Sequence, residues 1–420
     1  MLQSPQAGRA LGPERFDESC FDDGAVGVYV HLPFCERICP YCDFAVVAAS
    51  TLDPALEARV VAALCAELEA RREDFEGRAL ASLYFGGGTP SLFREESIVA
   101  LVDAVRRAFP VVSDAVETTL ELNPSSVLLP RLSGFRAAGV DRLSIGVQSF
   151  DDLRLKRLGR GHRAPVARRT LEAARAAGFD NLSLDLIFAG PGQTLDDLDR
   201  DLDELLEWRP EHVSPYELTF EPETPFGRAL ASGRLKACDE ELVIDMIGRI
   251  ESRLEAAGFE RYEISNYARP GRRARHNARY WQRQAVLGLG MGAHSMEVRR
   301  PGRPHGARRA NPRTLSDWLA RVDVCPAEVG EEEILSAETA RGEAVFLALR
   351  RREGLSARTF EAEFGDPPRR FFAAAIARAR SLGWLCEDSP GPGDFALTPA
   401  GRLVADSVAA EFVADPEAGG

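Results

Sequence analysis

An alternation of short β-rich runs and longer helical patterns between Val26 and Gly258 is the feature that most constrains the fold of this chain. The runs cover residues 26–32, 81–85, 117–122, 141–147, 181–188 and 212–219. Helical patterns follow them at residues 53–73, 94–108, 130–138, 163–177, 194–207 and 239–257, the first with Asp53 as N-cap and Pro54 at its first position. Strict β–α alternation predicts a parallel sheet, either an open doubly wound sheet or an incomplete barrel.

The pattern changes on both sides of this alternating region, residues 25–260. Residues 1–24 are polar and lack the apolar run of a secretory signal, so we expect a flexible tail. Residues 261–330 are rich in Arg, Gly, Pro and aromatic residues and are expected to be a connecting region. Residues 331–412 predict helices, a short hairpin and a last helix, which is the order of a winged-helix-like α+β domain. Residues 413–420 are expected to be disordered.

Charge and cysteine usage narrow the class of protein. The net charge of −13, from 52 basic and 65 acidic residues, argues against nucleic acid as the main partner. The basic stretches at 269–275 and 297–310 are interpreted as solvated loops. No stretch approaches the ~18 apolar residues of a membrane span, so we expect a cytoplasmic protein with reduced thiols. The scattered cysteines are interpreted as structural: Cys20, Cys65, Cys238, Cys325 and Cys386.

Three further cysteines directly follow the first predicted strand. Cys35, Cys39 and Cys42 form the pattern C-x3-C-x2-C in "CERICPYC". A closed structural zinc site needs four ligands, and His31 is the candidate for the fourth. A [4Fe–4S] cluster held by three thiolates, with one iron open to another ligand, fits the spacing better.

Polar and glycine-rich residues stand at the carboxyl ends of the later strands. The second strand ends in "FGGGTP", whose glycines allow a ligand to approach the backbone closely. Glu121, Gln148 and Asp185 mark the third, fourth and fifth strands, and the pair Tyr216–Glu217 marks the sixth. The carboxyl ends of strands form the functional face of a β/α barrel. The recurrence therefore favours an incomplete barrel with one shared pocket.

The cysteine pattern followed by GGGTP resembles the radical S-adenosylmethionine (SAM) superfamily. Further motifs resemble the group that contains oxygen-independent coproporphyrinogen III oxidase and the heme chaperone HemW: "VYVHLPFCERICPYCDF", "GGGTPSLF", "RLSIGVQSFDD", "LGRGH", "LDLIFAGPGQT", "YEISNYARPG", "HNARYW" and "LGLGMGAHS". The similarity runs from about Tyr29 to Ser295, and the C-terminal domain also resembles the one in this group. The resemblance implies an incomplete (β/α)6 barrel that holds a [4Fe–4S] cluster and S-adenosylmethionine.

The resemblance also assigns roles to individual residues. Cys35, Cys39 and Cys42 would hold the cluster. The residues that it implies for the S-adenosylmethionine site are Tyr29, Tyr41, Gly87, Gly88, Thr89, Glu121, Gln148, Arg160 and Asp185. From the residues alone, Asp185 could instead cap a neighbouring turn and Arg160 could form a surface ion pair.

Three features favour the chaperone branch of the group over the oxidase branch. The oxidase has a further cysteine two positions after the third, where this chain has Phe44, and a longer N-terminal segment. The chaperone branch carries H-N-x-x-Y-W, here "HNARYW" at residues 276–281. By that resemblance His276 binds heme iron, and Tyr280 and Trp281 offer flat apolar surface to the macrocycle. By spacing alone, His276 remains open as a core residue; His294 is placed near the barrel mouth rather than on heme.

The expected function is therefore that of a heme chaperone. It would pass heme to acceptor hemoproteins, respiratory proteins at the membrane among them, and an electron donor would serve the cluster. Arginines of "RPGRRARH" would pair with heme propionates, and loops near 270–310 would be mobile to release heme. The alternatives are oxidative decarboxylation of coproporphyrinogen III and an iron–sulfur sensor that binds DNA. A homodimer and peripheral membrane association stay open.

Overall fold

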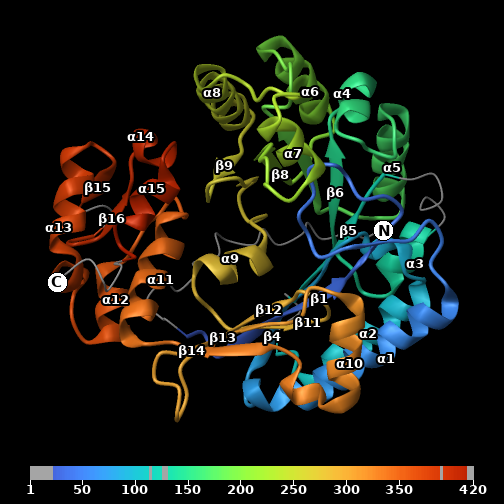
Figure 1. Ribbon diagram of the computed structural model, residues 1–420, viewed down its shortest axis with the longest axis horizontal. Coiled ribbons are helices and arrows are strands. Elements are labelled where there is room, and N and C mark those ends of the chain that lie inside the picture. The colour runs from blue at the N-terminus through green and yellow to red at the C-terminus, as the bar shows by residue number, and fades with distance from the viewer. Residues whose placement is uncertain (1–21, 113–115, 125–130, 388–390, 414–420) are drawn as a thin grey trace, which may run out of the picture.

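The computed structural model describes residues 22–112, 116–124, 131–387 and 391–413 (Figure 1). The tails expected at 1–24 and 413–420 lie almost entirely outside these ranges. Among the described residues, no helix is long and apolar enough to cross a membrane.

The six strands of the alternating region form one continuous parallel sheet, as predicted. They are β1 (Ala25–Leu32), β4 (Ala79–Gly87), β5 (Glu117–Leu122), β6 (Arg142–Gln148), β7 (Leu182–Phe188) and β8 (His212–Glu217), and each lies parallel to the next. The predicted helices are α1 (Pro54–Arg71), α2 (Glu95–Ala108), α3 (Leu132–Ala137), α5 (Ala164–Ala176), α6 (Leu195–Glu207) and α8 (Glu240–Ala256). Asp53 caps α1 by accepting the N–H of Ala55, as expected. Two short helices were not predicted, α4 (Asp152–Arg157) and α7 (Pro225–Ala231).

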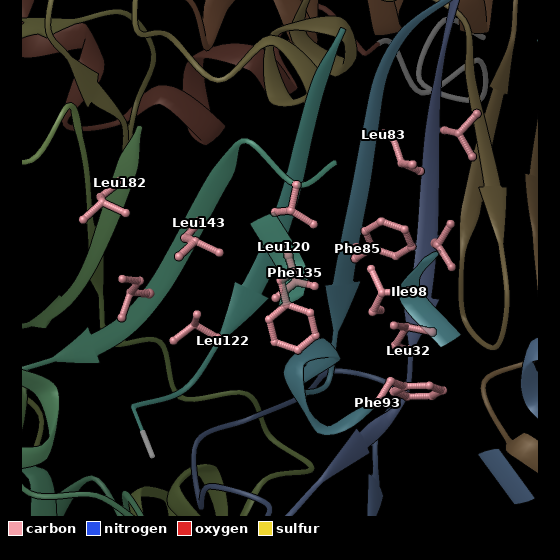
Figure 2. Packing of buried hydrophobic residues seen from close by; sticks show 14 of the residues in the cluster. Leu32, Leu83, Phe85, Phe93, Ile98, Leu120, Leu122, Phe135, Leu143 and Leu182 are labelled. Atoms are coloured by element: carbon pink, nitrogen blue, oxygen red, sulfur yellow. The ribbon is translucent and has the colours of Figure 1, made fainter. Parts of the chain in front are cut away.

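The two faces of this sheet have opposite character. On the outer face, alternate strand residues pack against the helices in one apolar core, which Figure 2 shows for Leu83, Phe85, Leu120, Leu122, Leu143 and Leu182 with Phe93, Ile98 and Phe135. The alternate positions facing the barrel lumen carry polar or glycine residues on strand after strand, including Ser82, Tyr84, Glu121, Ser144 and Asp185. Because side chains alternate along a strand, one sheet holds a stable apolar core and a polar interior.

The region expected to connect the domains instead extends the sheet at both ends. β9 (Glu260–Arg261) and β10 (Tyr267–Ala268) add antiparallel strands beyond β8. At the other end, β11 (Val286–Leu289) pairs parallel with β1 and is followed by antiparallel β12 (His294–Glu297), β13 (Ala307–Ala310) and β14 (Glu331–Ile334). Helices α9 (Arg275–Trp281) and α10 (Leu315–Val324) lie in the same region.

The sequence predicts a solvated loop at 297–310, but part of this stretch is strand. Charges on the two facing strands explain the difference. β13 pairs with β14 so that Arg308 lies opposite Glu333 and Arg309 opposite Glu332. Opposite charges on facing strands stabilise an antiparallel pair. Arg309 forms an ion pair with Glu332 at 2.8 Å across the two strands, whereas the Arg308 guanidinium bonds Glu343 of the C-terminal domain.

The C-terminal domain contains the predicted helices and hairpin around its own apolar core. Its elements are α11 (Ala337–Leu349), α12 (Ala357–Phe364), α13 (Pro368–Ser381), the hairpin β15 (Leu385–Glu387)–β16 (Phe395–Leu397), α14 (Pro399–Arg402) and α15 (Ala405–Ala410). The single last helix expected from the sequence is two short helices, because Val404 has non-helical torsion angles.

Candidate functional site

The cysteine loop is held at the carboxyl end of β1 by a small parallel sheet. Its strands, β2 (Phe34–Cys35) and β3 (Val47–Ala48), bracket the loop. Within the loop the N–H of Cys42 donates to the carbonyl of Cys39 at 3.1 Å. The Thr89 hydroxyl donates to the Cys35 sulfur at 3.5 Å, which ties the loop to the end of β4.

The donor chemistry of this loop fits a cluster better than a single metal ion. In the described part of the chain, no group of three or more His, Cys, Asp or Glu side chains is arranged to hold one ion. Both ring nitrogens of His31 are already engaged, Nδ1 with the Tyr29 hydroxyl at 3.0 Å and Nε2 with the Ala45 carbonyl at 2.7 Å. His31 is therefore not the free fourth ligand that a zinc site would need. Three thiols that bind different irons of one cluster do not have to converge on a point.

Gly87 and Gly88 allow β4 to pack against the cysteine loop. Gly87 has a φ of +104°, and a Cβ there would lie 2.4 Å from the His31 ring. A Cβ on Gly88 would lie 2.6 Å from the carbonyl oxygen of Phe34. The N–H groups of Gly88 and Thr89 donate to the carbonyls of Leu32 and Phe34, so here they anchor the loop.

Arg160 connects the loop to the barrel. Its guanidinium lies 3.6 Å from the Cys39 sulfur, 3.4 Å from the Tyr41 hydroxyl and 2.9 Å from the Gly146 carbonyl, and it also bonds the Asn123 side chain. Cys39, Thr89, Asn123 and Arg160 line a cavity of about 300 Å³. The structure thus brings predicted residues from the cysteine loop, β4 and the segment after α4 to one opening, together with Asn123, which the sequence analysis did not single out.

Other predicted residues face the lumen. Glu121 accepts the Tyr84 hydroxyl at 2.7 Å and the Gly87 N–H at 3.2 Å. Asp185 accepts the Ser144 hydroxyl at 3.3 Å; burial, reinforced by the Glu121 charge, raises the pKa of Asp185 to about 7. Gln148 has a φ of 67°, and its buried Oε1 has no partner among the described residues.

The HNARYW motif forms α9, and its histidine points into the barrel interior. His276 is 1 % exposed, its Nδ1 lies 2.9 Å from the Ser82 hydroxyl, and its ring stacks on Tyr84 at 5.1 Å. Glu117 fixes the start of α9 by accepting the N–H groups of Arg275 and His276 at 3.2 Å each. Ser82 and Glu117 were not among the predicted site residues, because the sequence around them carries no signal beyond strand alternation.

The chemical state of His276 suits a metal ligand. Burial, and then the charges of Arg279 and Arg142, lower the pKa of its imidazole to about 3, so the ring is neutral. Its buried Nε2 has no hydrogen-bond partner in the described ranges. A neutral imidazole with one free nitrogen is the form that binds iron.

Trp281 lies on the side of α9 that meets the C-terminal domain, whereas Tyr280 follows His276 by one helical turn and meets its ring edge-on at 5.4 Å. They belong to one apolar cluster with Phe346 and Leu347 of α11, and Figure 1 shows α9 between the barrel and that domain. The cavity that Trp281 lines is about 20 Å³, far smaller than a macrocycle. His276 Nε2 is thus suited to bind iron. The side chains packed around α9 have to separate before a porphyrin can enter.

The remaining predicted features occupy other places. Arg273, from the stretch expected to pair with propionates, forms an ion pair with Glu353 at 2.7 Å. His294 is exposed at the start of β12. The described scattered cysteines, Cys65, Cys238, Cys325 and Cys386, are free thiols, and Cys20 lies outside the described residues.

Comparisons with known proteins agree with this geometry. Residues 29–205 match the family model of the radical SAM superfamily, and residues 335–404 match that of the HemN C-terminal domain. The chain is 32% identical to the heme chaperone HemW of Bacillus subtilis over 92% of this chain and 99% of that protein. It is 36% identical to the heme chaperone HemW of Mycobacterium tuberculosis (strain CDC 1551), over 91% and 93% of the two chains.

A solved structure shares the fold across both domains. Coproporphyrinogen III oxidase (HemN) from Escherichia coli aligns with a TM-score of 0.77 at 23% identity, covering 92% of this chain and 90% of that chain. This similarity confirms the predicted fold class. The family implies a [4Fe–4S] cluster and S-adenosylmethionine as cofactors. Relatives that align over nearly their full length at more than 30% identity show that the chain belongs to the HemW family of the radical SAM superfamily.

Proposed function

We propose that this protein binds heme and transfers it to acceptor hemoproteins. The observation that carries the proposal is His276, a buried neutral imidazole whose Nε2 has no partner within the described residues, in a motif flanked by Tyr280 and Trp281. Relatives of nearly the same length are heme chaperones by name, which supports the same reading.

In this proposal the cluster is held by Cys35, Cys39 and Cys42. They lie at the carboxyl ends of the barrel strands, away from His276. Arg160 orients the cysteine loop through the Cys39 sulfur and the Tyr41 hydroxyl. Of the proposed S-adenosylmethionine contacts, Thr89 and Arg160 line the cavity. Tyr41, Gly87 and Gly88 belong to the cysteine loop and to the end of β4 packed against it, and Tyr29, Glu121, Gln148 and Asp185 lie on the barrel strands. When bound, the cluster supplies one-electron chemistry.

In this proposal, side chains of α9 bind heme and set its orientation. In this proposal the Nδ1–H of His276 donates to the Ser82 hydroxyl oxygen, which fixes the ring and leaves Nε2 unprotonated for iron. Fixing one ring nitrogen sets the orientation of a histidine ligand. Tyr280 and Trp281 supply apolar ring surface.

The test is an anaerobic heme titration followed by absorption spectroscopy on wild type and His276→Ala. We expect saturable binding with a Soret shift in wild type, and weakened binding with an altered spectrum in the variant. His294→Ala, which removes an exposed imidazole, is the matched control and should bind as wild type does.

Identical titrations for wild type and His276→Ala would return His276 to a core role. Anaerobic conversion of coproporphyrinogen III to protoporphyrinogen by the wild-type protein would establish the oxidase activity instead. Phe44 stands at the position of the extra cysteine of the oxidase, so we expect no turnover.

A further inference from the structure

The C-terminal domain covers the HNARYW motif with a specific set of side chains. Phe346 and Leu347 of α11 pack in one cluster with Tyr280 and Trp281. The Arg350 guanidinium lies 5.3 Å from the Trp281 ring centroid and 5.6 Å from that of Phe346. Residues of the C-terminal domain therefore form the surface that faces the proposed heme-binding helix.

Arg350 is a cation with spare binding capacity. Its ion pair with Asp406, at 2.7 Å, is weak because the Asp406 side chain is 81% exposed and screened by solvent. The buried Nε of Arg350 has no partner among the described residues. A guanidinium with a free N–H and a replaceable surface partner is suited to bind a carboxylate.

Space for a ligand lies beside this arginine. A cavity of about 330 Å³ between the barrel and the C-terminal domain is lined by Arg350, by Ile250 of α8 and by Leu403 and Val404. Ligand pockets typically measure about 300–1,000 Å³ and combine apolar walls with a few polar groups. Arg350 lines this cavity and also lies near the rings of Trp281 and Phe346, which do not themselves line it.

The barrel and the C-terminal domain are joined by the apolar cluster around Trp281 and Phe346 and by several ion pairs. Glu343 of α11 bonds both Arg283 and Arg308 of the barrel side, and Glu353 bonds Arg273. The apolar core of the C-terminal domain is separate from that of the barrel. Separation of α11 from α9 breaks these ion pairs and opens the small apolar cluster, but it leaves both main cores closed.

We propose that the heme site is shared between the domains, with Phe346 and Arg350 of the C-terminal domain as its second half. The macrocycle enters between α9 and α11 when the domains separate. Tyr280, Trp281 and Phe346 contact its faces, and Arg350 pairs with a propionate. This inference rests on the proposed heme function and assigns the C-terminal domain a direct part in it.

The experiment is the same anaerobic heme titration on full-length, cluster-loaded Arg350→Gln, Arg350→Lys and Phe346→Ala. Loss of one charge-assisted hydrogen bond predicts about tenfold weaker binding for Arg350→Gln, with partial rescue by Arg350→Lys. Arg341→Gln is the matched control. Arg341 lies on α11, and its guanidinium packs within the C-terminal domain, 4.2 Å from the ring centroid of Phe371. It should bind within about twofold of wild type.

Hydrogen exchange gives a second readout that needs no variant. Heme added to wild type should change amide protection in both α9 and α11, whereas a site confined to the barrel changes α9 alone. Heme binding that depends on His276 but is unaffected by Arg350→Gln and Phe346→Ala would overturn this inference and leave the proposed function standing. Failure of wild type to bind heme would overturn both.

Discussion

At the scale of single residues, the barrel lumen concentrates ionisable groups that an apolar interior would not hold. Asp185 and Glu121 have pKa values raised by burial, and Arg142 is 1 % exposed. Buried charges are costly unless they are paired or used, so such groups are typical of functional sites. The lumen therefore suits polar ligands, in agreement with a cofactor site at the carboxyl ends of the strands, beside the cysteine loop.

The raised pKa of Asp185 predicts a pH-dependent stability. The carboxyl group titrates near pH 4 when unfolded and near 7 when folded, so its stabilising effect is complete below about pH 4 and is lost as the pH rises through 7. Asp185→Asn removes this titration. The melting temperature of the variant, compared with that of wild type at the same pH, should therefore increase as the pH is raised from 5.5 to 8.5. Anaerobic thermal melts measure this, with exposed Asp180→Asn as control. A pH-independent difference would contradict the assignment.

Arg160 is expected to control retention of the cluster. Arg160→Ala removes bonds to the Cys39 sulfur, the Tyr41 hydroxyl and the Gly146 carbonyl, so iron and sulfide content after anaerobic reconstitution should fall by about half or more. Arg157→Ala, an exposed arginine on the neighbouring α4, should keep wild-type content. Equal content in both variants would show that Arg160 does not hold the loop.

At the scale of elements, the end of β4 and the cysteine loop form one interlocked unit. Backbone hydrogen bonds from Gly88 and Thr89 reach Leu32 and Phe34, and the Thr89 hydroxyl reaches Cys35. Glycine is required where two backbones approach this closely. The glycine run thus shapes the cluster site through packing, in addition to any contact with S-adenosylmethionine.

Gly88→Ala is expected to distort this unit. The new Cβ would lie 2.6 Å from the Phe34 carbonyl oxygen, a backbone atom that cannot move aside cheaply. Overpacking of this kind costs about 1–3 kcal/mol, so both the melting temperature and the cluster content should fall. Gly248→Ala, in open space on α8, should lower neither. Normal cluster content in Gly88→Ala would contradict the packing role.

At the scale of the whole molecule, ion pairs add to the apolar cluster around Trp281 and Phe346 where the barrel meets the C-terminal domain. Glu343 bonds two arginines of the barrel side, and Arg283 also bonds Glu363. Arg308 comes from the stretch interpreted as a solvated loop, and Arg273, from the stretch expected to pair with propionates, bonds Glu353. The expected mobility of loops near 270–310 stays a prediction, now focused on the contact between α9 and α11.

Glu343→Ala is expected to loosen the domain contact without unfolding either domain. Arg283 and Arg308 lose a shared carboxylate, so amide exchange in α9 and α11 should accelerate while the strands β4–β7 keep their protection. Glu338→Ala, on the exposed first turn of the same helix, should leave exchange unchanged. Unchanged exchange at α9 in Glu343→Ala would show that the ion pairs do not hold the domains together.

The sequence by itself determined the parallel α/β architecture, the capped first helix and the position of the cysteine loop. These features depend on local periodicity, local capping and spacing along one segment, which neighbouring residues encode. Within about two residues, the predicted strands and the longer helices have their observed bounds. The roles of the predicted site residues remain proposals, although the structure places many of them around one opening or in one lumen.

The tertiary structure alone decided which side chains meet. Ser82 and His276 are 194 positions apart, and Arg283 and Glu363 are 80 apart. No local pattern marks such pairs, because they form only when strands align and domains dock. The extension of the sheet by β9–β14 and the burial of α9 beneath the C-terminal domain arose in the same way. Packing, rather than sequence spacing, therefore decides how a ligand can reach His276.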